Sequence, residues 1–431
     1  MVIQMMNTDD GAYYRRLYRL WAVIAFGPSS RTLSELYTRF DNAESLYAAV
    51  TQDDAVRNEL PAEAVRSADS ITLSSAERVI ELCGKKGIKI VTADDDDFPE
   101  RLREIYNPPT VLFYKGDISG IDNRLNIGIV GTRKPSDYSR KTASALVNTL
   151  TKHGFDIISG FAEGIDICAH LQCIQSGGRT YAVIGSGLDY PYPKPNIPYR
   201  ELIEENGAVI SEYLPGTQPF PPNFLQRNRI LAGLSMGVAV IEAGEKSGSL
   251  NSAAHAVSQN KPVFAVPPCD LFDPRYKGNV RLIREGAVPL MGARDIYGEY
   301  SINPQHIIVA NESTAAQLEK IRLIAEGAAR AEQESDKHTS EKPIKKPETP
   351  AESEPVTESK PRQLTAEELE SFSDPIQKNI LIKLSEATSA MRGDELAEAL
   401  ETDIDDILTA LTELEILGNV QSQSGNYTLA D

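Results

Sequence analysis

A single arginine stands directly after a glycine–threonine pair, where a short apolar run in the middle of the chain ends. The run covers residues 127–130, and Gly131, Thr132 and Arg133 follow it. A helical pattern begins a few residues later, so the sequence predicts a strand, a tight turn and a helix. Backbone N–H groups converge at such a turn, glycine lets a phosphate approach closely, and a guanidinium suits phosphate. The turn therefore predicts phosphate binding, with an ordinary turn and a surface arginine as the alternative.

Other small, polar and basic residues follow later apolar runs. The candidates for a shared anion site are Ser159, Gly160, Lys194, Arg227, Asn228, Arg229, Ser247, Gly248 and Ser249. The Ser/Gly turns lead into helical segments, where backbone N–H groups and hydroxyls favour an anion. For each arginine, the alternative is a solvated surface charge. If the apolar runs are parallel strands, these residues lie along one rim of the sheet, and we expect them to bind a polyanion together.

Aromatic residues stand close to these candidates in the sequence. They are Tyr190, Tyr192, Phe220 and Phe224. Rings beside cations are typical of proteins that bind single-stranded nucleic acid, because unpaired bases stack on them. The alternative for each ring is packing within its own loop.

No combination of residues points to catalysis. His170 lies four residues after Asp166, so the two side chains share a helix face, and we expect their hydrogen bond to order the helix. His255 is expected to be structural. The sequence shows no nucleophile motif and no metal-ligand spacing, so we expect no catalytic residue, no cofactor and no metal.

The composition favours a cytoplasmic protein. No apolar run approaches the roughly 20 residues of a membrane span, and residues 1–16 lack the apolar stretch of a secretory signal. The four cysteines form no CxxC pair and no zinc-type spacing. We therefore expect reduced thiols and no membrane partner.

Apolar runs alternate with helical segments from about residue 125 to residue 291. The runs are IGIV, FDIIS, TYAVIG, GAVISEY, GVAVIEA and PVFAVP, with AVPLM expected as the last. Each run is short, apolar on both faces and rich in β-branched residues, which is typical of a parallel sheet covered by helices on both sides. Right-handed crossovers would place all the carboxyl ends of these strands on the same edge.

The chain divides into five expected regions. Residues 1–84 form a helical domain, 85–124 a connector with short strands, 125–298 the α/β core, 299–362 a mostly disordered linker and 363–431 a small domain. The linker is expected because it holds too few aliphatic residues to offset its ordering entropy. The run IAFGPSSRTLSELYTRF in the first domain resembles a helix-hairpin-helix or SAM-like unit, although a plain packing domain is favoured. Three helices and a hairpin in the last domain predict a winged helix.

Charge is unevenly distributed along the chain. The net charge is −18, yet residues 111–300 hold 19 Lys and Arg against 18 Asp and Glu. Residues 363–431 hold 3 basic and 15 acidic residues. Because carboxylates repel phosphates, we expect the last domain to bind protein, its own chain included, instead of DNA.

Together these segments resemble the DNA-processing protein A family, DprA, also called Smf. The blocks GTRKPSDYSR, SGFAEGIDICAH, AVIGSGLDYPYPKPN, GAVISEY, FLQRNRILAGLS, VAVIEAGEKSGSLNSAAHA and PVFAVP occur in the family's order and spacing. The resemblance is strong from about residue 85 to 290 and looser in the flanks. It implies an α/β fold with an extended Rossmann-like core, a SAM-like helical domain before it and a winged-helix domain after it.

The resemblance also implies a function. A member would bind single-stranded DNA without catalysis, form a homodimer and deliver the strand to the recombinase RecA during natural transformation. The family's DNA pocket corresponds to the candidates named above, from Gly131, Thr132 and Arg133 to the serines at 247 and 249. Pro268 stands where the family usually has glycine, so the loop of residues 269–276 is the least well matched part.

Two other functions stay open. The core also resembles the nucleotide-binding superfamily of cytokinin-activating phosphoribohydrolases, which use a glutamate near a glycine-rich phosphate loop. Here Glu242 precedes Ala243 and Gly244, and a Ser-Gly-Ser turn replaces the usual PGGxGT loop. That alternative predicts hydrolysis of a nucleoside monophosphate. A pure interaction scaffold would explain the flanking domains and would leave the rim arginines without a role.

Overall fold

The computed structural model describes most of the chain outside a long segment between the core and the last domain. The described residues are 8–40, 42–300, 320–324, 375–386, 391–400, 402, 407, 410–411, 414, 420–423 and 426–429. The chain separates into two compact units, Met1–Lys342 and Pro343–Asp431. Among the described residues, no helix has both the length and the apolarity that crossing a bilayer requires.

The N-terminal part of the first unit is helical, as predicted. Its helices are α1 (Thr8–Phe26), α2 (Arg31–Arg39), α3 (Ala43–Gln52), α4 (Asp54–Glu59), α5 (Ala62–Ser70) and α6 (Leu73–Lys85). Trp21 lies at the centre, with its ring 4.7 Å from that of Tyr47 and its Nε1 donating to the Ile71 carbonyl. α1 ends directly before Gly27, whose φ is +86°. Ser30 caps α2, because its hydroxyl accepts a hydrogen bond from the Leu33 N–H.

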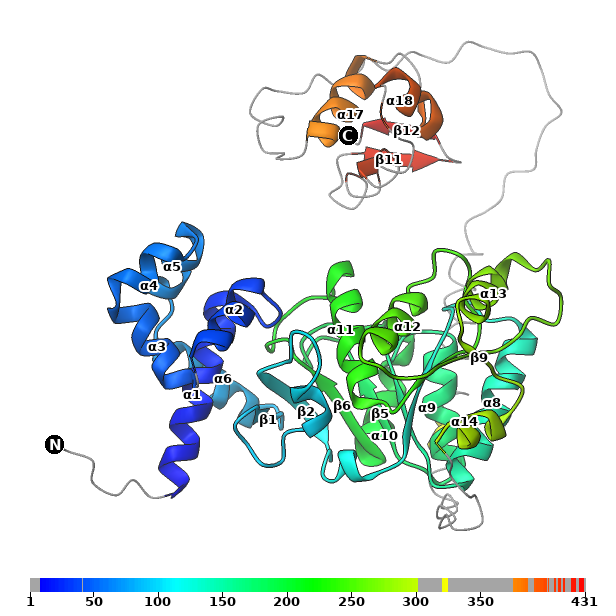
Figure 1. The fold of residues 1–431 in the computed structure, drawn as a ribbon, viewed down its shortest axis with the longest axis horizontal. Coiled ribbons are helices and arrows are strands. Elements are labelled where there is room, and N and C mark those ends of the chain that lie inside the picture. The colour runs from blue at the N-terminus through cyan, green and yellow to red at the C-terminus, as the bar shows by residue number, and fades with distance from the viewer. Residues whose placement is uncertain are drawn as a thin grey trace, which may run out of the picture. The chain divides into compact units, whose positions relative to one another are not determined.

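The core is a mixed, mostly parallel sheet of nine strands (Figure 1). The strands are β1 (Lys89–Thr92), β2 (Val111–Gly116), β3 (Asn126–Val130), β4 (Asp156–Ser159), β5 (Thr180–Val183), β6 (Gly207–Ser211), β7 (Val238–Val240), β8 (Val263–Ala265) and β9 (Val288–Pro289). Their order is β1-β2-β6-β5-β4-β3-β7-β8-β9. β2 pairs antiparallel with both β1 and β6. Every neighbouring pair from β6 across to β9 is parallel. The predicted Rossmann-like strands therefore all form, and their carboxyl ends share one edge.

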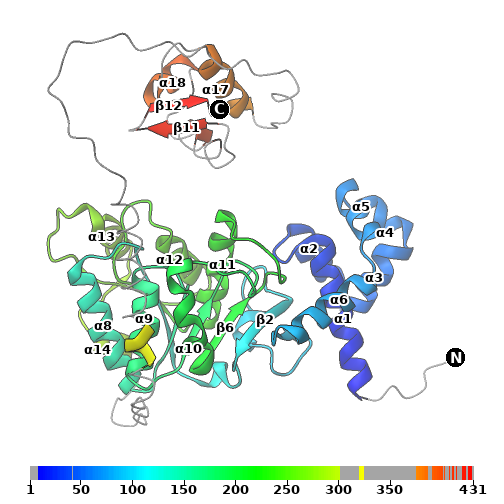
Figure 2. The ribbon, with the colours of Figure 1, turned by 180° about the vertical axis from the view of Figure 1, so that it is seen from behind.

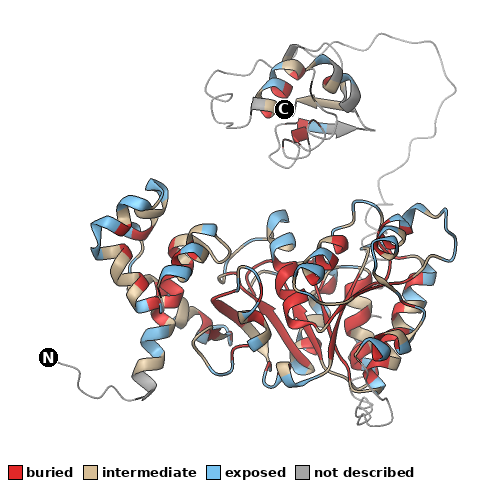
Figure 3. Cartoon of the chain, in the orientation of Figure 1, coloured by how far each residue is buried: buried red, intermediate tan, exposed pale blue. Residues whose placement is uncertain are grey.

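Helices cover both faces of the sheet (Figures 1 and 2). α11 (Pro221–Leu234), α12 (Ser249–Ser258) and α13 (Lys277–Arg284) pack on one face, and α8 (Asp137–Lys152), α9 (Ile165–Gln175), α10 (Arg200–Glu205) and α14 (Ala293–Glu299) on the other. The short helices are α7 (Glu100–Arg103), η1 (Ile121–Asn123), η2 (Lys194–Tyr199) and η3 (Pro274–Tyr276). Figure 3 shows that the strands are buried nearly throughout.

The strands are apolar on both sides because each side meets a different helix layer. Ile127 and Ile129 of β3 join an apolar cluster with Leu146 of α8. Val130 of the same strand joins the opposite cluster, with Leu231 of α11. A strand with this pattern has no face to give to water, so only its ends can carry a binding site.

The second unit has its own core. Its elements are α17 (Pro375–Glu386), β10 (Met391–Arg392), α18 (Gly393–Ala399), β11 (Val420–Gln423) and β12 (Asn426–Leu429), with the strands in the order β10-β12-β11. Most of the predicted third helix, residues 404–414, lies outside the described residues, but Ile407, Leu411 and Leu414 are buried in this core. The predicted hairpin forms between β11 and β12.

One short part of the predicted linker packs against the first unit. Residues 320–324 are helical, and Ile321 is 7% exposed in the apolar cluster that includes Leu202 of α10. The Lys320 ammonium lies 2.8 Å from a carboxylate oxygen of Glu205. The rest of the predicted linker lies outside the described residues.

Candidate nucleic-acid interface

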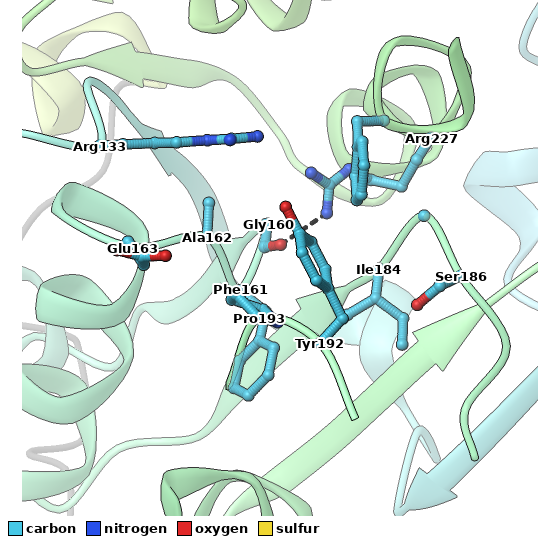
Figure 4. Close-up of a pocket in the computed structure, with 12 residues that line it drawn as sticks. Arg133, Gly160, Phe161, Ala162, Glu163, Ile184, Ser186, Tyr192, Pro193 and Arg227 are labelled. Atoms are coloured by element: carbon cyan, nitrogen blue, oxygen red, sulfur yellow. Dashed lines mark hydrogen bonds between the residues drawn. The ribbon is translucent and has the colours of Figure 1, made fainter. Parts of the chain in front are cut away.

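A pocket opens at the carboxyl edge of the sheet, beside the ends of β3, β4 and β5 and next to α11 (Figure 4). It holds about 400 Å³ of space, including the part open to solvent. Its lining residues are Arg133, Gly160, Phe161, Ala162, Glu163, Ile184, Gly185, Ser186, Tyr192, Pro193, Phe224 and Arg227. Segments that lie almost a hundred residues apart in the sequence therefore meet at one place.

Arg133 reaches into the pocket from the turn after β3. Its side chain is exposed, and it forms no hydrogen bond or ion pair with any described residue. Figure 4 shows it extending across the pocket toward Arg227. A guanidinium held this way keeps all its N–H donors available for a ligand.

Arg227 comes from α11 and is only 6% exposed. Its Nη1 donates to the Gly160 carbonyl at 2.7 Å and to the Val183 carbonyl, so it ties the ends of β4 and β5 together. Its Nε donates to the side-chain oxygen of Asn228. Nη2 donates to no described group and is free to meet a ligand.

The two arginines repel one another, and burial adds to the cost. Burial, and to a smaller extent the nearby Arg133, lowers the pKa of Arg227 to about 10, against the opposing effects of Asp166 and Tyr213. The guanidinium stays charged near pH 7 because its pKa remains well above that value. Two facing cations without an anion between them are an arrangement that a bound phosphate would stabilise.

Gly160 forms the floor between the two charged groups. A Cβ at this position would lie 2.6 Å from Oδ2 of Asp166 and 2.7 Å from Nη2 of Arg227. Because real Cβ contacts are essentially never that short, any larger residue here would force the Asp166 carboxylate or the Arg227 guanidinium to move.

Two rings form one wall of the pocket. The centroids of Tyr192 and Phe224 lie 5.5 Å apart, and the ring planes meet at 36°. Both residues line the pocket. Of the other predicted stacking residues, Phe220 is 54% exposed and does not line it, nor does Tyr190.

Some predicted contacts lie beside the pocket. Lys194 begins η2 directly after the lining residue Pro193; it is exposed and pairs with no described residue. The Gly248 carbonyl accepts a hydrogen bond from Asn228 at 3.4 Å, so the Ser-Gly-Ser turn is linked to Arg227 through Asn228. The hydroxyls of Ser247 and Ser249 lie 2.8 Å apart.

Two predicted site residues are engaged inside the protein. Arg229 is 3% exposed, and its Nη2 lies 2.6 Å from a carboxylate oxygen of Glu212 and 3.3 Å from the Ser29 hydroxyl. It does not line the pocket, because residues two apart on a helix point to different sides. Ser159 is fully buried, and its hydroxyl donates to the Ile129 carbonyl of the neighbouring strand.

The predicted bond between Asp166 and His170 does not form. Oδ2 of Asp166 accepts from the backbone N–H groups of Gly160 and Ala162, at 3.1 and 3.3 Å. Nδ1 of His170 lies 2.6 Å from the Thr180 hydroxyl, and burial lowers the pKa of this histidine to about 3. The N–H groups of Gly160 and Ala162 are therefore already paired with a carboxylate of the protein.

A second carboxylate fills the turn after β7. Oε2 of Glu242, which is 1% exposed, accepts from the Ser136 N–H at 2.9 Å, the Ser136 hydroxyl at 2.6 Å and the Tyr276 hydroxyl at 3.2 Å. This is the point where strand order reverses, between β3 and β7, and where α/β proteins usually bind their ligand. A glutamate bonded in this way does not face an open site, which counts against the phosphoribohydrolase alternative. In the described part of the chain, no cluster of His, Cys, Asp or Glu is arranged to hold a metal ion.

The sequence reasoning missed the role of Asp166 and the lining residues Phe161, Ala162 and Glu163. The three lining residues lie in the turn between β4 and α9, and Asp166 lies in the first turn of α9. No sequence signal marked Asp166, because its partners are the backbone N–H groups of Gly160 and Ala162, which any residue other than proline supplies.

The fold and the pocket define a Rossmann-like α/β protein with an arginine-lined pocket at the carboxyl edge of its sheet, joined to a winged-helix domain. Residues 89–301 match the family described as DNA recombination-mediator protein A, and residues 348–426 match the DprA winged helix domain. The chain belongs to the DprA/Smf family of DNA-processing proteins, as the sequence blocks predicted.

Curated relatives and a solved structure agree with this assignment. The DNA processing protein DprA of Bacillus subtilis is 37% identical over 259 residues, which cover 60% of this chain and 86% of the relative. Protein Smf of Synechocystis is 34% identical over 344 residues, covering 79% of this chain and 80% of the relative. The X-ray structure of DprA from Streptococcus pneumoniae aligns with a TM-score of 0.58 at 31% identity, covering 66% of this chain and 97% of that chain.

Proposed function

We propose that this chain binds single-stranded DNA in the pocket between Arg133 and Arg227 and acts without catalytic turnover. The observation that carries the proposal is the meeting of these two guanidinium groups over the side-chain-free floor at Gly160. A bridging phosphate would accept from both groups and would relieve their mutual repulsion.

The pair of rings favours single-stranded DNA over duplex DNA as the ligand. Tyr192 and Phe224 stand beside the arginines, so a strand whose phosphate lies between the cations could place a neighbouring base against a ring. Bases in a duplex are stacked on one another and cannot do this, whereas each base of a single strand exposes a face. Lys194 would add a further phosphate contact at the mouth of the pocket, and the Ser-Gly-Ser turn would border the strand beyond Asn228.

The direct test compares two exposed arginines near α8. Arg133→Ala should weaken binding of a fluorescent oligo-dT about tenfold at low salt, because one or more phosphate contacts are lost. The slope of log K against log salt should become shallower by about 0.7 for each lost contact. Arg140, an exposed residue of α8 outside the pocket lining, supplies the matched control Arg140→Ala, which should leave both quantities unchanged. Equal affinity of the two variants would refute the pocket assignment.

Arg227→Ala is a less clean variant. It should also weaken binding of all sequences alike, but it removes the bonds that join Gly160 to Val183. We therefore expect a lower melting temperature together with the loss of affinity, whereas Arg133→Ala should lose affinity alone.

We further propose that the bound strand is delivered to RecA during natural transformation, by a homodimer of this chain. The support is the family assignment, since a recombination mediator implies a recombinase partner. The test measures RecA filament assembly on a strand coated with single-strand-binding protein. The wild-type chain should speed assembly, and Arg133→Ala should not. No acceleration by the wild type would refute this part of the proposal alone.

The acidic last domain is proposed to bind protein instead of DNA. A chain that ends at Lys342 keeps the contact between Lys320 and Glu205 and removes the second unit. Its affinity for oligo-dT should stay within about twofold of the full chain. A large loss of affinity on truncation would show that the domain contributes to DNA binding.

A further inference from the structure

The carboxylate of Asp166 lies under the floor of the pocket, at the start of α9. The residue is 6% exposed, and its Oδ2 accepts from the N–H groups of Gly160 and Ala162. Backbone N–H groups at the start of a helix after a parallel strand are a usual seat for phosphate. In this turn the Asp166 carboxylate of the protein itself occupies the position of such a phosphate.

Asp166 also lies close to the buried cation of the pocket. One Cβ position, that of Gly160, would be 2.6 Å from Oδ2 of Asp166 and 2.7 Å from Nη2 of Arg227. The two atoms therefore lie within about 5 Å of one another, a range in which opposite charges interact strongly. No ion pair joins these two described residues, so Nη2 keeps its donors while Asp166 offsets part of the charge of Arg227.

We propose that Asp166 is an internal competitor, which weakens the attraction of Arg227 for a phosphate of the bound strand. This inference rests on the proposed function of the pocket. A phosphate on Nη2 would stand near the Asp166 carboxylate, and the two anions would share one cation. Binding of the strand would then favour the protonated form of Asp166 and would be coupled to the uptake of a proton.

The protonation states of the surrounding groups make this coupling measurable. Burial raises the pKa of Asp166 to about 6, against the opposing effects of Arg227 and of the N–H groups of Ala162 and Gly160. Arg227 stays charged between pH 5 and 8. His170, which lies on α9 with Asp166, stays neutral over this range. Of the other groups nearby, Cys168 has a pKa raised by burial, and the side chains of Arg133 and Glu163 are exposed at the mouth of the pocket.

The sign of the pH effect follows from these states. Above pH 6 Asp166 is mostly ionised, so the pocket holds one negative charge that opposes the strand. As the pH falls through 6 the carboxylate becomes neutral, and affinity for oligo-dT should rise. A phosphodiester keeps its charge across this range, so the ligand itself contributes no titration.

The test measures binding of a fluorescent oligo-dT to the full-length chain carrying Asp166→Asn. The variant keeps the shape of the side chain and one acceptor oxygen but removes the charge. At pH 7.5 it should bind about tenfold more tightly than the wild type, which corresponds to about one unit of pKa coupling. Its affinity should not change between pH 5.5 and 8, and its salt slope should equal that of the wild type, because the number of phosphate contacts is unchanged.

Asp189→Asn is the matched control. Asp189 also accepts a backbone N–H, from Gly216 at 2.6 Å, but it pairs with Lys86 and does not line the pocket. This variant should bind like the wild type at every pH. Should Asp166→Asn fail to fold, calorimetry of the wild type in two buffers of different ionisation enthalpy carries the test, with proton uptake on binding expected at pH 6.5.

Two results would overturn the proposal. Asp166→Asn that folds and binds equally or more weakly would show that Asp166 only holds the turn, and so would absence of proton uptake by the wild type. Failure of the wild type to bind oligo-dT at any pH and low salt would instead refute the proposed function, so the two failures are distinguishable.

Discussion

The turns after β4 and β7 both hold a carboxylate where proteins of this fold often hold a phosphate. After β4, Asp166 accepts two backbone N–H groups and leaves a pocket above it, with Arg133 and Arg227 on its walls. After β7, Glu242 accepts from Ser136 and Tyr276 and is closed off by them. The difference lies in the arginines, because a cation that is not fully paired keeps the first turn attractive for an added anion.

The largest difference in DNA affinity is expected when a glycine is changed to alanine in one turn or in the other. Gly160→Ala places a Cβ within 2.7 Å of both Asp166 and Arg227, so the floor of the pocket must shift, and binding of oligo-dT should fall about a hundredfold. Gly244→Ala in the other turn meets only the Pro274 carbonyl, at 3.9 Å, and should bind normally. Fluorescence anisotropy measures both. Equal losses would remove the distinction between the two turns.

A smaller effect is expected from the rings. Phe224→Ala removes one member of the ring pair and should weaken oligo-dT binding about tenfold, because a base–ring stack contributes about 1–3 kcal/mol. Tyr138→Ala is the control, since Tyr138 is a half-exposed ring beside the closed turn, 6.0 Å from the ring of Tyr276. Titrations with a duplex of the same length should show little change for either variant. A tenfold loss of affinity in Tyr138→Ala would instead place the bound strand at the turn after β7 and would contradict the pocket assignment.

The smallest effect on binding is expected from the closed turn itself. Glu242→Gln should leave oligo-dT affinity within about twofold, while the free energy of unfolding falls by about 1–3 kcal/mol, because the hydrogen bonds from Ser136 and Tyr276 lose a charged acceptor. Urea titrations measure the stability change. Release of a free base from a nucleoside monophosphate by the wild type, abolished in Glu242→Gln, would instead favour the phosphoribohydrolase alternative.

The positions of the strands could be predicted because burial on both faces leaves a clear signal in the sequence. Residues 127–130 are apolar without alternation, and β3 forms there with every residue buried. The common edge then follows from the handedness of the crossovers, and it brings Arg133 and Arg227 together as predicted. The closeness of the two arginines at the rim of the sheet could therefore be predicted from the sequence pattern alone.

The sequence did not predict which rim residues face the pocket and which pair with other residues of the protein. Arg227 and Arg229 look alike in the sequence, yet one faces the pocket and the other pairs with Glu212. The phase of α11 decides between them, and a helix that is buried on several sides gives little periodic signal. The role of Asp166 under the pocket floor was missed because its partners are backbone N–H groups, which carry no sequence signature.

The most direct test of the central claim is ultraviolet crosslinking of oligo-dT to the full-length chain, followed by mapping of the labelled peptides. The account predicts crosslinks on the peptides that contain Tyr192 and Phe224, lost when Arg133 is changed to alanine. Crosslinks confined to the N-terminal helices or to the second unit, with none at the carboxyl edge of the sheet, would contradict it.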